Sequence, residues 1–554
     1  MPDLQKWEKI GAAKRAALSE LIPSEFRIPQ NFLPSNSQLD VSKFPEESGW
    51  FTRKELDITS STSPVILQNM ANQIWTAEEV TKAFCKRAAA AHQLTNCLSE
   101  IFFNEAIASA KSRDNQLRET GKTVGPLHGL PISLKDNFNI IGKDSTLGFT
   151  SLVNDPAKSN STLVDLLEAA GAVLYVKTNV PTAMMIAESV NNVYGRTVNP
   201  LNRMLTSGGS SGGESALIAF GGSPLGIGTD IGGSLRIPAA CTGIFTLRPS
   251  FGRFPTQSCR SGLAGQEAVQ SVNGPMAKTL EDIILYSKTV IDSQPWLHDA
   301  KCLPIPWRPV VPKRKLKLAV MWNDGMVIPT PPVQRALRET VENLKKAGHE
   351  IVEWDNSLHP QAVSILSRMF LADGGKSVRA LLAPTKEPFR PEMQAYADAT
   401  DIGVYGMWKL QAERSELQRK YLELWNSYNG LDAILGPVTP FSSVENGMFK
   451  HVGYTGVFNI VDYSAVSFPC GVTVNKSKDK PNAEYSPLSE TCQTIHSEYN
   501  PDIVHGMPVS LQLVARRLEE EKVLSMTNTI LQAIVPSESV PFKLNLQPSL
   551  ASRL

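Results

Sequence analysis

Residues 207–243 read SGGSSGGESALIAFGGSPLGIGTDIGGSLRIPAACTG and hold eleven of the chain's 37 glycines. Glycine allows positive φ and lets the backbone approach a ligand closely, so paired glycines beside serine favour loops whose N–H groups point at a negative charge. A flexible glycine-serine linker is the alternative. The apolar runs at 216–220 and 225–227, and a β-prone run after Ser234, favour an ordered segment instead.

Common nucleotide, hydrolase and metal motifs fit the chain poorly. A phosphate-binding loop needs a glycine-lysine pair, which this segment lacks, and a dinucleotide loop needs glycine where the chain has Ile231. Residues 209–213 match the G-x-S-x-G nucleophile elbow around Ser211, but residues 199–205 read as a loop rather than the strand that an elbow requires. None of the eight histidines lies in an H-x-x-x-H or H-E-x-x-H pattern, so we expect no metal and no cofactor.

Composition and charge are those of an ordinary globular protein. The 554 residues include 42% hydrophobic and 20% charged side chains, with a mean hydropathy of −0.15. A formal net charge of +1 gives no bulk attraction to phosphate backbones, so we expect no nucleic-acid partner. The sequence has no membrane-length apolar run and no signal-peptide region at its amino terminus. Seven scattered cysteines without a C-x-x-C pair favour a reducing compartment, and we expect a cytoplasmic protein.

Helical and strand patterns alternate along the chain. Helix-like periodicity covers residues near 163–167 and over 80–94, 333–347, 407–425 and 518–534. β-prone runs occupy residues 131–134, 173–177, 317–321, 350–354, 433–435, 466–474 and 509–514. A helix followed by a strand, at 163–177 and again at 333–354, predicts α/β layering. We expect one large α/β domain over residues 1–554, with residues 1–60 as a helical amino-terminal extension.

The glycine-rich segment resembles a known family signature. Residues 208–240, GGSSGGESALIAFGGSPLGIGTDIGGSLRIPAA, are similar to the signature of the amidase-signature hydrolases, and GPLHGLPISLKD at 125–136 resembles the segment that carries their catalytic lysine. Residues 177–181, 194–200 and 506–513 also look familial, so the resemblance covers most of the chain. It implies a central mixed, twisted β-sheet covered by helices on both faces, with residues 125–250 as the catalytic core segment.

The resemblance implies a catalytic triad of Lys135, Ser210 and Ser234, with a cis peptide bond before Ser210. The chemistry suits these residue types. A serine hydroxyl becomes a good nucleophile only when a base takes its proton, and a lysine can be that base when burial keeps it partly neutral. A second serine between them can accept one proton while it donates another.

Further site residues follow from the same resemblance. Backbone N–H groups of the oxyanion hole come from Ile231, Gly232, Gly233 and Ser234. Thr229, Asp230 and Arg236 are expected around them, and an Asp230–Arg236 ion pair would fix the loop. Met184 corresponds to an acyl-pocket position, with simple core packing as its alternative. The role of Ser211 is left open: its hydroxyl could bond Lys135 or the substrate, or it could only satisfy backbone hydrogen-bonding groups.

The overall layout resembles the fungal acetamidase or general amidase branch, for example at residues 7–15 and 458–463. This implies hydrolysis of small primary amides to a carboxylate and ammonia through an acyl-serine intermediate. Hydrolysis of carbamates, fatty acid amides or a secondary-metabolite amide is the alternative, and a catalytically inactive scaffold is an alternative of another class. Whether the chain forms a homodimer is left open. The last residues, Ser552-Arg553-Leu554, differ from the S-K-L peroxisomal signal only by arginine, which leaves peroxisomal targeting open.

Overall fold

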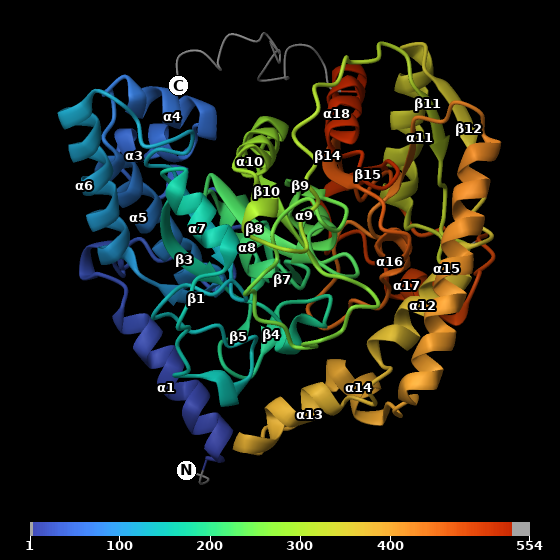
Figure 1. Cartoon of the computed structure of the whole chain (residues 1–554), viewed down its shortest axis with the longest axis horizontal. Coiled ribbons are helices and arrows are strands. Elements are labelled where there is room, and N and C mark those ends of the chain that lie inside the picture. The colour runs from blue at the N-terminus through green and yellow to red at the C-terminus, as the bar shows by residue number, and fades with distance from the viewer. Residues whose placement is uncertain (1–3, 483, 535–554) are drawn as a thin grey trace.

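A mixed β-sheet crosses the whole molecule in the computed structural model, which describes residues 4–482 and 484–534 (Figure 1). Within those residues the sheet has eleven strands, and it contains both parallel and antiparallel pairs. The strands in spatial order are β1 (Leu98–Ile101), β3 (Val173–Thr178), β2 (Pro131–Lys135), β8 (Leu225–Asp230), β10 (Val272–Ala277), β9 (Phe245–Arg248), β14 (Ala465–Thr473), β15 (Pro508–Val514), β13 (Ala433–Pro437), β11 (Lys317–Val320) and β12 (Glu350–Glu353).

Helices cover both faces of this sheet. Successive side chains of β11 demonstrate this, because they pack alternately in two hydrophobic clusters, one on each face. Leu318 and Val320 pack in the hydrophobic cluster that contains residues of α11 (Pro331–Lys346) and α18 (Glu520–Ile534). Ala319 between them packs in a second cluster with residues of α12 (His359–Phe370), α15 (Gly403–Ser427) and α16 (Gly453–Ile460). Successive strand residues point to opposite faces, so each face has its own helical layer. The predicted mixed sheet between helices is confirmed.

The remaining elements surround the sheet and its loops. At the amino-terminal end lie α1 (Lys6–Glu20), α2 (Phe44–Glu47), α3 (Arg53–Thr59), α4 (Ser63–Ala71), α5 (Ala77–Thr95) and α6 (Phe103–Thr120). The other helices are α7 (Thr162–Ala169), α8 (Gly212–Phe220), α9 (Arg236–Thr242), α10 (Leu280–Asp292), α13 (Lys376–Leu382), α14 (Gln394–Asp398) and α17 (Glu490–Glu498). Two small hairpins pair β4 (Val190–Asn191) with β5 (Gly195–Arg196) and β6 (Val198–Asn199) with β7 (Asn202–Thr206).

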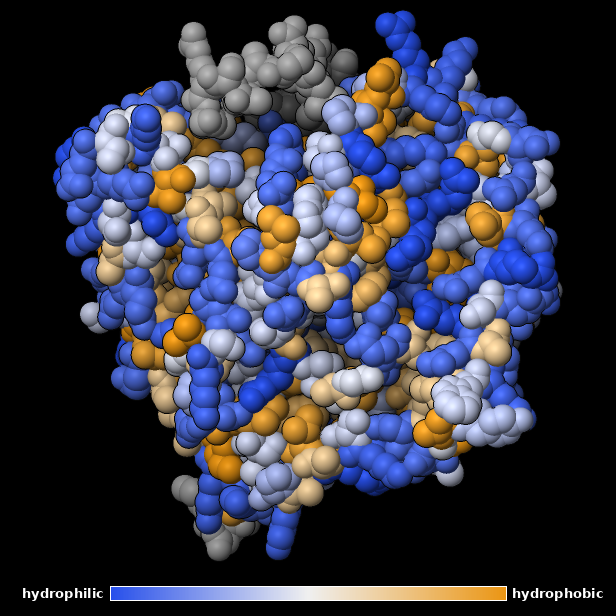
Figure 2. Space-filling view, viewed as in Figure 1, coloured by the Kyte–Doolittle hydropathy of each residue, from blue (hydrophilic) through white to orange (hydrophobic). Residues whose placement is uncertain are grey.

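The surface is mixed in character. Figure 2 shows hydrophilic side chains over most of one face, with hydrophobic ones scattered between them. Among the described residues, no helix is long and apolar enough to cross a membrane.

The carboxyl-terminal Ser552-Arg553-Leu554 lies outside the described residues. The domain boundaries at residues 60, 125 and 250 stay predictions.

Each of the seven predicted β-prone runs overlaps a strand, and the predicted helices correspond to α5, α7, α11, α15 and α18. Two predictions in and just before the glycine-rich segment were wrong. The β-prone run after Ser234 is the helix α9, where Pro238 lies in the first turn and Gly243 ends the helix with φ of +71°. Residues 199–205, expected to form a loop, include the strand β7, which is hydrogen-bonded to β6.

Candidate active site

Lys135 is the last residue of β2, and its side chain is completely buried. Its Nζ lies 2.7 Å from the Oγ of Ser210 and 2.7 Å from the Oγ1 of Thr229. Thr229 is on β8, which pairs in parallel with β2. Two neighbouring strands therefore fix the lysine and one of its partners, while Ser210 approaches from the loop between β7 and α8.

Burial lowers the pKa of Lys135 to about 7, although the carboxylates of Asp230, Glu214 and Asp136 act to raise it. Desolvation disfavours a buried ammonium group, and these carboxylates offset only part of that cost. Near neutral pH a substantial fraction of Lys135 is neutral and has a lone pair that can accept a proton. This is the property that a general base requires.

Ser210 lies in a tightly packed turn. The peptide bond between Gly209 and Ser210 is cis, as the family resemblance implies, and the Ser210 side chain is buried. A Cβ atom on Gly209 would lie 2.6 Å from the backbone nitrogen of Glu188, closer than real side chains come. Glycine is therefore required before Ser210 for steric reasons.

The hydroxyl of Ser211 bonds backbone groups, whereas Lys135 bonds the side chains of Ser210 and Thr229. The Ser211 hydroxyl donates to the Thr229 carbonyl at 3.3 Å and accepts from the Thr229 N–H at the same distance. Its backbone N–H donates to the carbonyl of Ser234 at 3.2 Å. Ser211 thus satisfies backbone groups and ties the two serine-bearing loops together. The strand β7 precedes Ser211, so the argument against a nucleophile elbow, that residues 199–205 form a loop, was wrong. The hydrogen bonds of the Ser211 hydroxyl to the Thr229 backbone disfavour Ser211 as the nucleophile instead.

Ser234 is half-buried in the loop between β8 and α9. With Ser210 and Thr229 it lines a narrow pocket that has about 320 Å³ of empty space, part of it open to solvent. The predicted residues Met184 and Ile231 also line this pocket, and Asp230 and Arg236 do not. Its walls are Ala183, Met184, Met185, Ser210, Thr229, Ile231, Ser234, Ser261, Leu263 and Ser271.

Asp230 and Arg236 form a completely buried ion pair beneath the loop that carries Ser234, with Arg236 Nε 3.0 Å from the carboxylate. Burial alone would raise the pKa of Asp230, but the Arg236 guanidinium and the Asn459 amide hold it at about 2. Arg236 also donates to the Asn459 side chain at 2.7 Å and to Gln512 at 3.3 Å. The predicted pairing of Asp230 with Arg236 is present, and it anchors both ends of the loop.

The candidate oxyanion-hole N–H groups are not equivalent. The N–H of Gly233 donates to Asp230 Oδ1 at 2.8 Å, so the carboxylate already holds it. Within the described residues, the N–H groups of Ile231, Gly232 and Ser234 have no hydrogen-bond acceptor. Those three donors are therefore free to bind an oxygen atom, and Gly233 holds the loop in shape.

Sequence reasoning missed two residues of α16 that complete this loop. The hydroxyl of Thr455 donates to the carbonyl of Gly232 at 2.8 Å, and Asn459 donates to Asp230 at 2.7 Å. Both lie more than 220 positions from their partners, so no local pattern joins them. For Asn459 the available signal was the familial look of residues 458–463, and Thr455 lies outside that segment.

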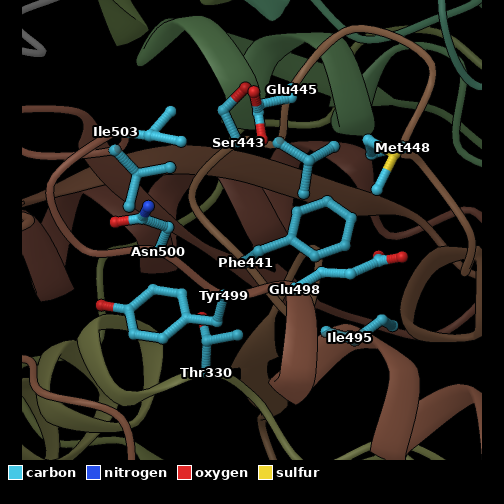
Figure 3. A pocket seen from close by; sticks show the side chains of 12 residues that line it. Thr330, Phe441, Ser443, Glu445, Met448, Ile495, Glu498, Tyr499, Asn500 and Ile503 are labelled. Carbon is cyan, nitrogen blue, oxygen red and sulfur yellow. The ribbon is translucent and has the colours of Figure 1, made fainter.

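A second pocket lies elsewhere, between the segments around Phe441 and Tyr499 (Figure 3). None of the predicted site residues lines it. In residues 4–482 and 484–534, no group of three or more His, Cys, Asp and Glu side chains is arranged to hold a metal ion. Burial raises the pKa of the Cys241 thiol to about 12, so this cysteine is not a competing nucleophile near neutral pH.

Comparisons with known proteins relate nearly the whole chain to amidases. A family model described as Amidase matches residues 79–524. The chain is 38% identical to an acetamidase of Emericella nidulans over 95% of its length and 98% of that protein, and 41% identical to the putative amidase kk1C of Curvularia clavata over the same shares. The solved structure of a fatty acid amide hydrolase superposes with a TM-score of 0.92 at 35% identity, covering 95% of both chains.

Proposed function

This chain belongs to the amidase family and hydrolyses amide C–N bonds, and we propose that Ser234, Ser210 and Lys135 carry out that reaction. The observation that supports the proposal most is the 2.7 Å contact between Lys135 Nζ and Ser210 Oγ, made by a buried lysine whose pKa is lowered to about 7. Ser234 opens onto the same pocket as Ser210. We assign Lys135 as the base, Ser210 as the relay and Ser234 as the nucleophile.

In the first half-reaction, neutral Lys135 accepts the proton of Ser210 while Ser210 accepts the proton of Ser234. The Oγ of Ser234 then bonds to the amide carbon. The carbonyl oxygen becomes an oxyanion, which the free N–H groups of Ile231, Gly232 and Ser234 stabilise. When the C–N bond breaks, the proton held by Lys135 returns through Ser210 to the departing nitrogen, leaving an acyl-Ser234 ester and a free amine.

The second half-reaction repeats the proton movements with water in place of Ser234 as the nucleophile. Water enters in place of the amine, gives a proton to Ser210 as Ser210 passes its own to Lys135, and attacks the ester carbon. Collapse of the second oxyanion breaks the bond to Ser234, whose oxygen regains the proton. The products are a carboxylic acid, ionised in solution, and a neutral lysine ready for another cycle.

Small primary amides are the substrates that we propose, with ammonia as the amine product. The narrow pocket supports this choice because its size suits a short acyl group and its walls include the apolar side chains of Met184, Met185 and Leu263. Acetamidases among the similar proteins agree with it. A long acyl chain would require these side chains to move, and the likeness to a fatty acid amide hydrolase makes such amides the second candidate.

A substrate panel tests this choice. Ammonia release is measured with acetamide, benzamide, a long-chain primary amide and ethyl carbamate at equal concentrations. We expect the highest kcat/KM for the short amides. Preference for the long-chain amide by more than about tenfold, which is 1.4 kcal/mol in transition-state binding, would replace the proposed substrate class by the second candidate.

We also propose that the protein acts in the cytoplasm. All seven cysteines are free and six of them are buried, as suits a reducing environment. The peroxisomal alternative depends on Ser552-Arg553-Leu554. Imaging a fluorescent reporter that ends in this tripeptide, with and without Leu554, decides between them, because only a functional signal would collect in peroxisomes.

A further inference from the structure

Glu214 is a completely buried carboxyl group that the proposed mechanism does not use. It lies in the first turn of α8, four residues after Ser210. One of its oxygens contacts the Ser133 hydroxyl, and the other accepts from Thr178 Oγ1 at 2.6 Å. Ser133 precedes Lys135 by two residues on β2, and Thr178 pairs with Lys135 across the sheet. Glu214 is therefore packed on the same face of the sheet as Lys135.

The number of available protons decides the charge of this carboxyl. Ser133 contacts both Glu214 and the Oγ of Ser223, the latter at 2.9 Å, and Ser223 Oγ lies 2.8 Å from the carbonyl of Leu225. These three contacts need three protons, but the two serines supply only two, and a carbonyl supplies none. A hydrogen bond in each of the three contacts therefore places the third proton on Glu214, which then donates to Ser133, Ser133 to Ser223, and Ser223 to Leu225.

The electrostatic surroundings agree with a neutral acid. Burial raises the pKa of Glu214 to about 7, against the hydrogen bonds with Ser133 and Thr178 and the charge of Lys135, which lower it, so the acid is neutral below that pH. The other titratable groups that face it are the thiol of Cys97 and the phenol of Tyr175, and burial raises the pKa of both. Both are neutral near pH 7, so no fixed cation other than protonated Lys135 acts to ionise Glu214.

We propose that Glu214 is a positioning residue that, while protonated, keeps Lys135 neutral enough to act as a base. The proposal rests on the proposed role of Lys135. Asp230 and Asp136 also face the lysine, but Asp230 is neutralised by Arg236. An ionised Glu214 would add a negative charge close to Lys135 and raise its pKa, because a nearby opposite charge favours the ammonium form.

Two variants separate a protonated Glu214 from an ionised one. Glu214→Gln reproduces the neutral acid, since its amide can donate to Ser133 while its oxygen accepts from Thr178. The acid limb of the kcat/KM profile should keep its midpoint. In Ser223→Ala, Ser133 no longer has Ser223 as an acceptor, so its hydroxyl can donate to Glu214. That hydrogen bond stabilises the carboxylate, and Glu214 then ionises more readily. The acid limb of Ser223→Ala should move to higher pH, by about one unit.

Difference infrared spectroscopy of the folded enzyme gives a readout that needs no turnover. The wild type should show the C=O band of a buried protonated carboxyl below pH 7, Glu214→Gln should lose it, and the ion-paired control Glu188→Gln should keep it. Absence of this band, or an acid limb moved about one unit lower in Glu214→Gln, would overturn the proposal. If instead Lys135 variants keep their activity while the Glu214 band is present, the proposed role of Lys135 fails and the charge assignment of Glu214 stands.

Discussion

The Nζ atom of Lys135 and the Oγ atom of Ser210 lie 2.7 Å apart, although 75 positions separate the two residues in the chain. The end of β2 supplies the lysine, and the turn before α8 supplies the serine. Because the lysine is buried and its pKa is lowered to about 7, this contact joins a group able to accept a proton to a group able to give one.

The pH dependence of the reaction follows from the same pKa. Below it Lys135 carries a proton and cannot act as a base, so kcat/KM should rise about tenfold per pH unit and level off above about pH 7. Initial rates of ammonia release across that range measure the profile. A rate that does not change with pH there would mean that another group, or none, takes the proton.

Lys135→Met should lower kcat/KM at pH 7 by about 100-fold to 10,000-fold, the usual contribution of a general base. Lys177→Met is the matched control, since this lysine is also buried but donates to Asp144 and Ser145 away from the pocket. Kinetics of both purified variants, normalised to the folded fraction, should show the large loss only for Lys135.

Gly233 has a backbone that an alanine would strain. Its φ is +132°, and an added Cβ would lie 2.2 Å from the Oγ1 of Thr455. Gly233→Ala should lower the free energy of unfolding by about 1–3 kcal/mol in urea titrations. Gly232→Ala provides the control, because the nearest atom to its added Cβ is 3.5 Å away, on Phe370. Equal stability of the two variants would contradict this account of the loop.

The Asp230–Arg236 pair should be costly to break. Arg236→Met leaves the Asp230 carboxylate buried without its cation, so the free energy of unfolding should fall by about 3–5 kcal/mol. Denaturation of Arg419→Met serves for comparison, because Arg419 pairs with glutamates on the exposed surface of α15 and its loss should leave stability nearly unchanged. A small effect at Arg236 would show that the loop does not depend on this pair.

The sequence predicted the sheet better than the glycine-rich strands within it. Runs such as 131–134 and 173–177 are rich in β-branched and apolar residues, and each became a strand. By contrast β8 contains Gly226 and Gly228, and β10 contains Pro275, which lower β-propensity; pairing with neighbouring strands holds them in the sheet instead. Long-range pairing of this kind leaves no local pattern.

The site was predicted unevenly for a similar reason. The structure places Lys135 in contact with Ser210, and Asp230 beside Arg236, as the residue types and the family resemblance indicated; the contact of Lys135 with Thr229 was not predicted. The engagement of Gly233 by Asp230 could be foreseen only from the fold of the loop, since four consecutive N–H groups look alike in sequence. Thr455 was out of reach because it meets Gly232 only through the packing of α16 on the sheet.

The most direct test of the central claim is to locate the nucleophile chemically. The folded enzyme is treated with a fluorophosphonate, which reacts with activated serines, and the modified peptide is identified by mass spectrometry. The account predicts one adduct, on Ser234, that is absent in Ser234→Ala and forms at least about 100-fold more slowly in Lys135→Met. An adduct on Ser211 or another serine, or no adduct at all in folded and active enzyme, would contradict it.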